Sequence, residues 1–292
     1  MSSLHRTPAR PRHSRLVVLL VSASLSLSVD AEGPAIVQGS DANALFGVDD
    51  RVAAFLSANR GGNGGGDQSQ QAGDALVGTD AAELMIGALG VDVMLGAGGN
   101  DILIGGTEDF NPLNRDRAFG GAGSDVFLWA PGDGNDFFDG GAGDDVVMLG
   151  LIGEQRDAEG GEAAAPVFAV TPPGNPGSQD FDGIYIDPSS RLPIMDVANG
   201  PGFCEVVDSS NGGAELIALG LDHLVRFTLR GPAADVSNPD TGLRIALHLQ
   251  DTEYLVCGGA NPGETVALDL RTSPPTPIDV SELPSSAFDL IR

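Results

Sequence analysis

Acidic residues return at a fixed interval through the middle of the chain, each two positions before an apolar residue and most behind a run of glycines. Five of the seven steps between these acids are nine residues, and the other two steps, of fifteen and eleven residues, contain turn-rich insertions. Carboxylates that recur in this way are oxygen ligands for a hard metal cation, so metal binding is the chemistry that the pattern predicts. The acids are Asp74, Glu83, Asp92, Asp101, Asp116, Asp125, Asp136 and Asp145.

Each period follows the nonapeptide Gly-Gly-x-Gly-x-Asp-x-U-x, in which U is apolar. The clearest copies are residues 120–128 and 140–148, with 96–104 and 87–95 close to them. A nonapeptide of this kind can make a tight turn, for which glycine supplies positive φ angles, and then a short strand. The pattern predicts a coil of parallel strands with position eight as an inward core column. The position-eight residues are Leu76, Met85, Met94, Leu103, Ala118, Phe127, Phe138 and Val147.

Coiling would stack the acids of alternate turns, because neighbouring strands lie ~4.8 Å apart. At an effective dielectric constant of about 20, two carboxylates ~5 Å apart repel by roughly 3 kcal/mol. A dication that takes six to eight oxygen ligands from these carboxylates and from turn carbonyls removes the repulsion, and calcium suits such a flexible cage better than magnesium. A Gly/Asp-rich linker is the alternative, but a linker has no reason to keep an apolar residue two positions after each acid.

Over about residues 69–150 the repeat resembles the repeats-in-toxin (RTX, hemolysin-type) calcium-binding family. The resemblance implies a parallel β-roll in which each ion lies between two turns on the same side, held by position-six aspartates and turn carbonyls. It implies one column of acids at Glu83, Asp101, Asp125 and Asp145, and a second at Asp74, Asp92, Asp116 and Asp136. The Asp74 and Glu83 turns lack most of the glycines and are left out of the ligand set. The implied set is Asp92, Asp101, Asp116, Asp125, Asp136 and Asp145, with turn residues Gly96, Gly98, Gly120, Ala122, Gly140 and Ala142.

The chain of 292 residues carries 41 Asp and Glu against 15 basic residues, a net charge of -26. Nucleic acid is therefore not an expected partner, since phosphates require a basic face. Residues 1–31 are expected to be a secretory signal peptide or an N-terminal anchor, because four arginines precede the apolar run 16–29 and small residues follow it. We expect a secreted, extracellular or cell-envelope protein without a membrane span after signal removal. RTX proteins usually leave the cell through a C-terminal signal, so the export route stays open.

The expected fold is all-β: a calcium-binding parallel β-roll, then an antiparallel β-sandwich-like domain, with a short N-terminal helix. We predict a helix at 41–56 and a glycine-rich linker within residues 32–68, the roll over 69–150, a Gly/Pro-rich linker over 151–180 and the β-rich domain over 181–292. Alternating apolar and polar residues predict strands at 184–186, 204–208, 223–230, 243–250, 253–257 and 265–270. Cys204 and Cys257, the only two cysteines, are predicted to form a disulfide bond, with a metal site or a redox pair as the alternative.

Three classes of function remain open. The first is an exported calcium-binding protein whose repeats fold as a scaffold, with calcium ions as its partners. The second is an adhesive or carbohydrate-binding exoprotein, for which self-association or an extracellular glycan would be the partner. The third is a secreted hydrolase with the roll as an accessory module. The sequence contains neither the His-Glu-x-x-His nor the Gly-x-Ser-x-Gly motif, so no residue is assigned a catalytic role.

Positions seven and nine flank the inward residue and should point outward, because strand side chains alternate faces. On one sheet all eight are apolar: Leu84, Ile86, Ile102, Ile104, Val126, Leu128, Val146 and Met148. The other sheet is mixed: Ala75, Val77, Val93, Leu95, Arg117, Phe119, Phe137 and Asp139. An apolar face of the first kind is rarely bare on a monomer. We expect the region after residue 180 to cover it, with the 41–56 helix or a second copy of the chain as alternatives.

Overall fold

The described part of the chain begins after the N-terminal segment and has several internal gaps. The computed structural model describes residues 33–39, 73–87, 91–106, 115–130, 133–154, 166–168, 184–200, 202–208, 216, 218, 220–229 and 244–292. The predicted signal segment 1–31, the predicted helix 41–56, the insertion 107–114 and most of the predicted linker 151–180 lie outside the described residues.

Strands account for about half of the described residues, and the fold is all-β as predicted. The helical elements near the C-terminus are a 3-10 helix η3 (Val280–Glu282) and a helix α3 (Ser285–Phe288). The strands within the repeat are β2 (Ala75–Val77), β3 (Glu83–Ile86), β4 (Val93–Gly98), β5 (Ile102–Ile104), β6 (Arg117–Ala122), β7 (Val126–Trp129), β8 (Phe137–Ala142) and β9 (Val146–Leu149). The others are β1 (Ala35–Gln38), β10 (Leu151–Glu154), β11 (Val167–Phe168), β12 (Met195–Asp196), β13 (Gly202–Val207), β14 (His223–Leu229), β15 (Arg244–Gln250), β16 (Tyr254–Gly258), β17 (Thr265–Asp269) and β18 (Thr276–Ile278).

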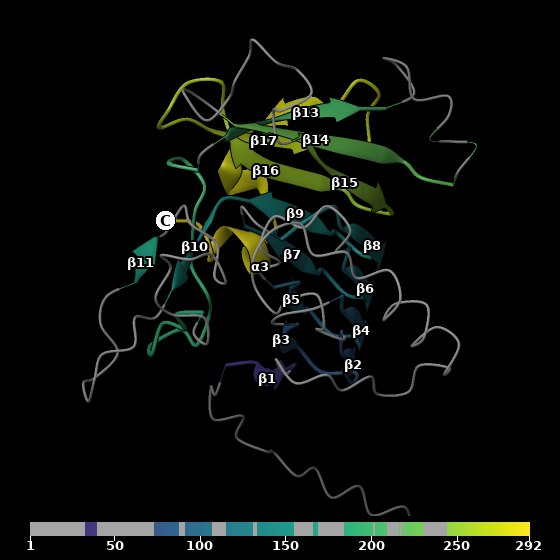
Figure 1. The fold of residues 1–292 in the computed structure, drawn as a ribbon, viewed down its shortest axis with the longest axis vertical. Coiled ribbons are helices and arrows are strands. Elements are labelled where there is room, and N and C mark those ends of the chain that lie inside the picture. Colours follow the sequence, from purple (N-terminus) through teal and green to yellow (C-terminus); the bar gives the residue numbers. More distant parts are fainter. Residues whose placement is uncertain are drawn as a thin grey trace, which may run out of the picture. The chain divides into compact units, whose positions relative to one another are not determined.

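Successive strands of the repeat region, residues 73–149, alternate between two sheets (Figure 1). Sheet A has the order β1-β3-β5-β7-β9-β16-β17-β18, and sheet B has the order β13-β14-β15-β8-β6-β4-β2. Within the repeat region each strand pairs in parallel with the strand two places further on, so that Leu103 lies opposite Phe127 and Phe127 opposite Val147. Position eight therefore stacks on position eight, as the nonapeptide period predicts. The turns need glycine, because Gly121 and Gly141 have φ angles of 104° and 93°.

The predicted inward column is confirmed. All eight position-eight side chains are at most 8% exposed and belong to one hydrophobic cluster between the sheets. Phe127 of sheet A stacks on Phe138 of sheet B, with ring centroids 5.4 Å apart. Burial of an apolar residue from every coil stabilises the stack along its whole length.

Strands of the C-terminal region lengthen both sheets. Strand β15 pairs in parallel with β8, and β16 pairs in parallel with β9. Beyond them β14 and β13 add antiparallel strands to sheet B, while β17 and β18 add them to sheet A. Contacts group residues 33–292 in one compact unit. Five of the six predicted C-terminal strands are present within two residues of the expected bounds, whereas 184–186 contributes isolated bridge residues only.

The predicted disulfide bond between Cys204 and Cys257 is confirmed. Cys204 lies in β13 of sheet B and Cys257 in β16 of sheet A, with their Cα atoms 6.3 Å apart. The bond therefore joins the two sheets across 53 residues of chain. Closing a loop of that length restricts the unfolded chain and stabilises the fold by about 4 kcal/mol in the chain-entropy account.

The outer face of sheet A is covered, as expected from its composition. Its eight outward residues at positions seven and nine are at most 9% exposed. They form a second hydrophobic cluster with residues that come largely from the region after 180, among them Met195, Val197, Leu283, Ala287 and Leu290. The outer face of sheet B remains open, since Val77 is 63% exposed and Leu95 is 40% exposed.

Leu128 and Leu95 provide a test of this asymmetry, because both occupy position nine but lie on different sheets. Leu128→Arg would place an unpaired charge in the covered cluster and should lower the free energy of unfolding by roughly 3 kcal/mol or more. Leu95→Arg adds the same group to the open face and should change it by less than about 0.5 kcal/mol. Denaturant unfolding of both full-length variants measures the difference, and equal losses would contradict a covered sheet A.

Candidate metal centre

The eight position-six acids are buried in the structure. Asp74 is 5% exposed and Glu83 is 3% exposed, while the six aspartates from Asp92 to Asp145 have no exposed surface. Each acid lies at or just before the start of a strand, so the two sheets sort the acids into two columns. Glu83, Asp101, Asp125 and Asp145 follow sheet A, and Asp74, Asp92, Asp116 and Asp136 follow sheet B.

A ladder of hydrogen bonds runs along each column. In every step the main-chain N–H of one acid donates to a carboxylate oxygen of the acid in the next coil on the same side. In the sheet A column the steps are Glu83 to Asp101 (2.8 Å), Asp101 to Asp125 (2.8 Å) and Asp125 to Asp145 (2.7 Å). In the sheet B column they are Asp74 to Asp92 (2.5 Å), Asp92 to Asp116 (2.6 Å) and Asp116 to Asp136 (2.9 Å). Each of the six aspartates from Asp92 to Asp145 in these columns therefore uses its Oδ1 to hold the neighbouring turn.

The second carboxylate oxygen has a different environment. In the part of the chain that is described, the Oδ2 atoms of Asp101, Asp125, Asp136 and Asp145 are buried and accept no hydrogen bond. A buried acceptor without a donor loses its hydration and gains nothing in return, at a cost of about 1–3 kcal/mol or more when it is charged. These oxygens fit a cation better than any neutral donor, because they need charge compensation as well as a contact.

Glycine at position one brings carbonyl oxygens next to these carboxylates. A Cβ atom on Gly96 would come closer than 3.0 Å to both Asp101 Oδ2 and the carbonyl oxygen of Gly120. The same holds one coil further on, where a Cβ on Gly120 would meet Asp125 Oδ2 and the carbonyl oxygen of Gly140. Side-chain and main-chain oxygens from successive turns thus converge on one side of each glycine, which is a donor set of the kind that calcium takes.

The other predicted turn residues are placed differently. The carbonyl oxygens of Ala122 and Ala142 accept hydrogen bonds from the N–H groups of Gly99 and Gly123, both at 2.9 Å. Gly98 donates its N–H to the Thr79 carbonyl oxygen at 3.0 Å. These contacts join neighbouring turns, and each accepting carbonyl keeps a second lone pair.

Burial dominates the electrostatics of the columns. It raises the pKa of Asp101 to about 7, and the charges of Asp125 and Glu83 add to the rise. Burial likewise raises the pKa of Asp125 to about 6 and that of Asp145 to about 7. Arg271 and Arg292 form their ion pairs with Asp144, Asp269 and Asp187 rather than with Asp101, Asp125 or Asp145. Without a metal the carboxyl groups of Asp101, Asp125 and Asp145 favour protons, because burial penalises their charged form and neither of these arginines pairs with them.

Two further acids belong to the site and were not predicted. Asp133 has no exposed surface; its Oδ2 accepts the Ala130 N–H at 2.7 Å and its Oδ1 has no donor among the described residues. It lies beside Asp136, whose pKa is raised well above its usual range by burial and by the Asp133 charge. Glu253 accepts the Asp145 N–H at 2.8 Å, so it extends the sheet A column. The sequence signal for Glu253 was an acid directly before the apolar triplet 254–256.

The sheet B column also has its own glycines, which the ligand prediction omitted. A Cβ on Gly87 would meet Asp92 Oδ2 and the carbonyl oxygen of Gly105, and a Cβ on Gly105 would meet Asp116 Oδ2. Gly105 precedes the six-residue insertion, so the nine-residue count hid its place in the turn.

No protein-family model, no curated protein and no solved structure matches the chain. Among the described residues, no group of three or more His, Cys, Asp or Glu side chains gathers into a metal cluster. Stacked turns bring the carboxylates of neighbouring position-six acids together in pairs. Any further oxygen ligands of a metal ion would therefore be main-chain carbonyls, such as those of Gly120 and Gly140. Over the same residues, none of the helices has the length and apolar character needed to cross a membrane.

Gly96 and Gly98 test whether the glycine at position one makes room for the carboxylate. Gly96→Ala would push its Cβ against Asp101 Oδ2 and the Gly120 carbonyl, and should lower the free energy of unfolding by about 2 kcal/mol. Gly98→Ala is the matched control, because the nearest atom to its Cβ would be 3.6 Å away, an ordinary contact. Denaturant unfolding compares the two variants. Equal stability of the variants would show that the oxygens do not depend on that space.

The raised pKa values predict how metal-free protein responds to pH. Between about 3.8, the ordinary aspartate value, and about 7, the folded chain holds more protons at Asp101, Asp125 and Asp145 than the unfolded chain. Stability contributed by these groups is greatest at the acidic end and is lost as the pH rises through this window. The far-ultraviolet strand signal of chelator-treated protein should therefore be stronger at about pH 5, where these acids hold protons, than at about pH 8.

Asp125→Asn is the control for this pH dependence, because it removes one of the three titrating groups. The variant should show a smaller difference between the two pH values. Asp269 and Asp279 have lowered pKa values and lose their contribution only below the window. Burial lowers the pKa values of His223 and His248, so these two groups act in the opposite direction within the window. Asp125→Asn keeps both histidines, so its difference from the wild type isolates the contribution of Asp125. An equal pH dependence of the strand signal in Asp125→Asn and in the wild type would contradict the assignment.

Proposed function

We propose that this chain is an exported calcium-binding protein whose repeat region is a parallel β-roll that folds around calcium ions and serves as a scaffold. The observation that supports it best is the row of buried Oδ2 atoms at Asp101, Asp125 and Asp145, none of which accepts a hydrogen bond in the described structure. Turn carbonyls stand beside the first two of them, in the spaces left by Gly96 and Gly120.

The donor set favours calcium over other cations. It consists of carboxylate and carbonyl oxygens, whereas zinc prefers the nitrogen and sulfur of His and Cys. Calcium accepts six to eight oxygens in irregular arrangements, and magnesium demands a strict octahedron. The RTX resemblance of residues 69–150 points the same way. Extracellular calcium modules bind at about 0.1–1 mM, which suits an exported chain. The Cys204–Cys257 bond supports export, because disulfide bonds persist in oxidising compartments.

Stacked neighbours would share the ions. In the sheet A column, Asp101 and Asp125 with the Gly120 carbonyl would hold one ion, and Asp125 and Asp145 with the Gly140 carbonyl would hold another. In the sheet B column, Asp92, Asp116 and Asp136 are the carboxylate ligands, with the Gly105 carbonyl beside Asp92. A bound calcium ion supplies the positive charge that allows stacked carboxylates to stay ionised inside the fold. The residues of this chain supply the spacing, the dry environment and the oxygen atoms.

The C-terminal strands are proposed to form a sandwich-like end to the roll. Strands β13 to β15 lie in one sheet and β16 to β18 in the other, and within each set the strands are antiparallel. Val225, Phe227 and Leu247 of the first set share a buried cluster with Leu255 and Cys257 of the second. A two-layer arrangement with one internal core is the packing that a β-sandwich requires.

Calcium titration of the full-length protein tests the proposal. At about pH 8, far-ultraviolet circular dichroism should show little strand signal in chelator and a cooperative gain at roughly 0.1–1 mM calcium, because ion binding and folding are coupled. Strand signal that is already complete in chelator and unchanged by calcium would contradict the proposal.

Asp125→Asn refines the test, because Asp125 stacks between Asp101 and Asp145. Isothermal titration calorimetry should count at least one ion fewer for this variant than for the wild-type protein. Asp80→Asn is the matched control, since Asp80 lies in the repeat region but is exposed. Its ion count should equal that of the wild type. Equal counts for all three proteins would remove Asp125 from the ligand set.

A further inference from the structure

The coil continues beyond the nonapeptides. Residues 247–256 form one more turn of it, although about a hundred residues of chain separate them from β9. His248 of β15 lies opposite Phe137, and Tyr254 of β16 lies opposite Val146, so this last turn follows the register of the turn before it. It reaches from one sheet to the other in fewer residues than the nonapeptide does, and Asp251 has a φ angle of +42° in the tight connection.

Glu253 occupies the place of a position-six acid. In the sheet A column the N–H groups of Glu83, Asp101 and Asp125 donate in turn to the carboxylates of Asp101, Asp125 and Asp145. The next step has the same form: Asp145 donates its N–H to Glu253 Oε2 at 2.8 Å. The longer glutamate side chain reaches the position that aspartate takes in the nonapeptide turns. The sheet B column has no such extension, because Leu247 precedes His248 where Asp136 precedes Phe137.

Asp251 supplies the matching carbonyl oxygen. A Cβ on Gly96 would meet the Gly120 carbonyl, and a Cβ on Gly120 would meet the Gly140 carbonyl. A Cβ on Gly140 would meet the Asp251 carbonyl in the same way, and it would also touch the side chain of Asp145. The last turn therefore repeats both kinds of oxygen, the carbonyl of position one and the carboxylate of position six.

We infer that a further calcium ion binds at this junction, held by the carboxylates of Asp145 and Glu253 and by the carbonyl oxygen of Asp251. The inference rests on the proposed function, and it extends the ions from the repeat to residues of the C-terminal region. The carboxylate of Asp145 points to a ligand independently, because it has no exposed surface and its Oδ2 accepts no hydrogen bond from the described chain.

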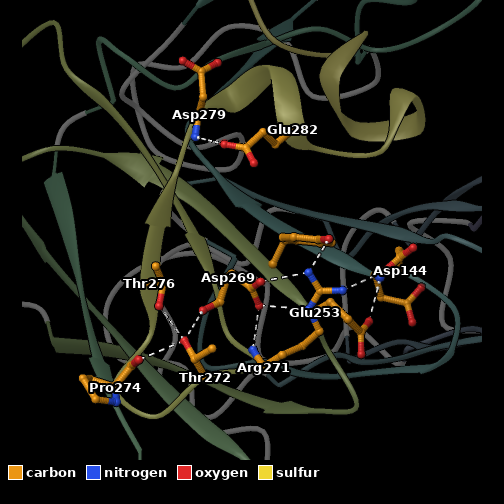
Figure 2. A network of polar contacts seen from close by, with 11 residues as sticks. Asp144, Glu253, Asp269, Arg271, Thr272, Pro274, Thr276, Asp279 and Glu282 are labelled. Carbon is orange, nitrogen blue, oxygen red and sulfur yellow. Dashed lines mark hydrogen bonds and ion pairs between the residues drawn. The ribbon is translucent and has the colours of Figure 1, made fainter.

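Arg271 is an alternative source of positive charge at this junction, and its charge acts on the Glu253 carboxylate. Figure 2 shows its guanidinium group between Asp269 and Asp144, with Glu253 nearby. Its Nε and Nη2 donate to the two oxygens of Asp269 at 3.0 and 2.8 Å, and Nη2 also donates to the Tyr254 hydroxyl at 2.8 Å. Nη1 lies 3.4 Å from Asp144. These partners engage all three guanidinium nitrogens, and Asp145 is not among them. The charge of the Asp145 carboxylate is therefore left for a bound ion to compensate.

An ion in this position would join the C-terminal strands to the repeat. The Asp145 ligand precedes β9, whereas Glu253 and Asp251 belong to the turn that leads into β16. Calcium would then protect β16 against opening together with β9, because both strands depend on the same ion.

Calorimetric calcium titration of the full-length protein tests the junction with Glu253→Gln, which keeps the shape of the side chain and removes its charge. This variant should bind one ion fewer than the wild-type protein. Glu205→Gln is the matched control, because Glu205 is an exposed glutamate on β13 in the same region. Its ion count should be that of the wild type.

Hydrogen exchange gives a second measurement that does not rely on the count. Calcium should slow exchange at 254–258 in the wild-type protein and in Glu205→Gln, but much less in Glu253→Gln, while residues 120–128 respond alike in all three. An unchanged ion count and unchanged protection in Glu253→Gln would overturn the junction site and leave Arg271 as the compensating charge. A wild-type protein that binds no calcium would overturn the proposed function itself, a result distinct from the loss of one ion.

Discussion

Repulsion between stacked carboxylates is the constraint on which the rest of this structure depends. Strand pairing at ~4.8 Å brings the acids of each column together, and the two-sheet core removes them from water. In each column a hydrogen bond offsets part of the cost of burying the carboxylates, because one carboxylate oxygen accepts the N–H of the neighbouring acid. The other oxygen lies buried beside glycine and carbonyl groups. These hydrogen bonds hold neighbouring turns together but add no positive charge, which is why we propose that a dication binds there.

The two sheets have different surroundings because their outward residues differ. Sheet A has apolar residues on both faces, and its outer residues bury themselves against segments around 195 and 283–290. Sheet B carries Arg117 and Asp139 among its outward residues and stays accessible at Val77 and Leu95. Burial of the apolar face contributes most of the hydrophobic stabilisation outside the inner column. The C-terminal segments thus complete the core of the repeat region as well as forming strands of their own.

The coil also needs an end. A stack of parallel strands presents unpaired N–H and C=O groups at its last strands, and such edges invite pairing with other chains. In this protein β15 and β16 pair with β8 and β9, and antiparallel strands then continue each sheet. The Cys204–Cys257 bond joins the two sheets within this extension. Repeat proteins commonly require a terminal unit of different sequence for this purpose, and residues 244–258 provide it here.

Much of the fold and part of the candidate site could be read from the chain alone, because a short period translates directly into register. The alternation of sheets, the inward column from Leu76 to Val147, the apolar face of sheet A and the two acid columns all follow from counting nine residues. Glu253 could not be placed by counting, because it meets Asp145 across 108 residues of chain without a repeat to link them. Gly105 and Asp133 lie at insertions that interrupt the count. Tertiary packing also decides which segments cover sheet A. The hydrophobic effect is not directional, so any apolar segment of the chain could bury that face, and the sequence does not indicate which one does.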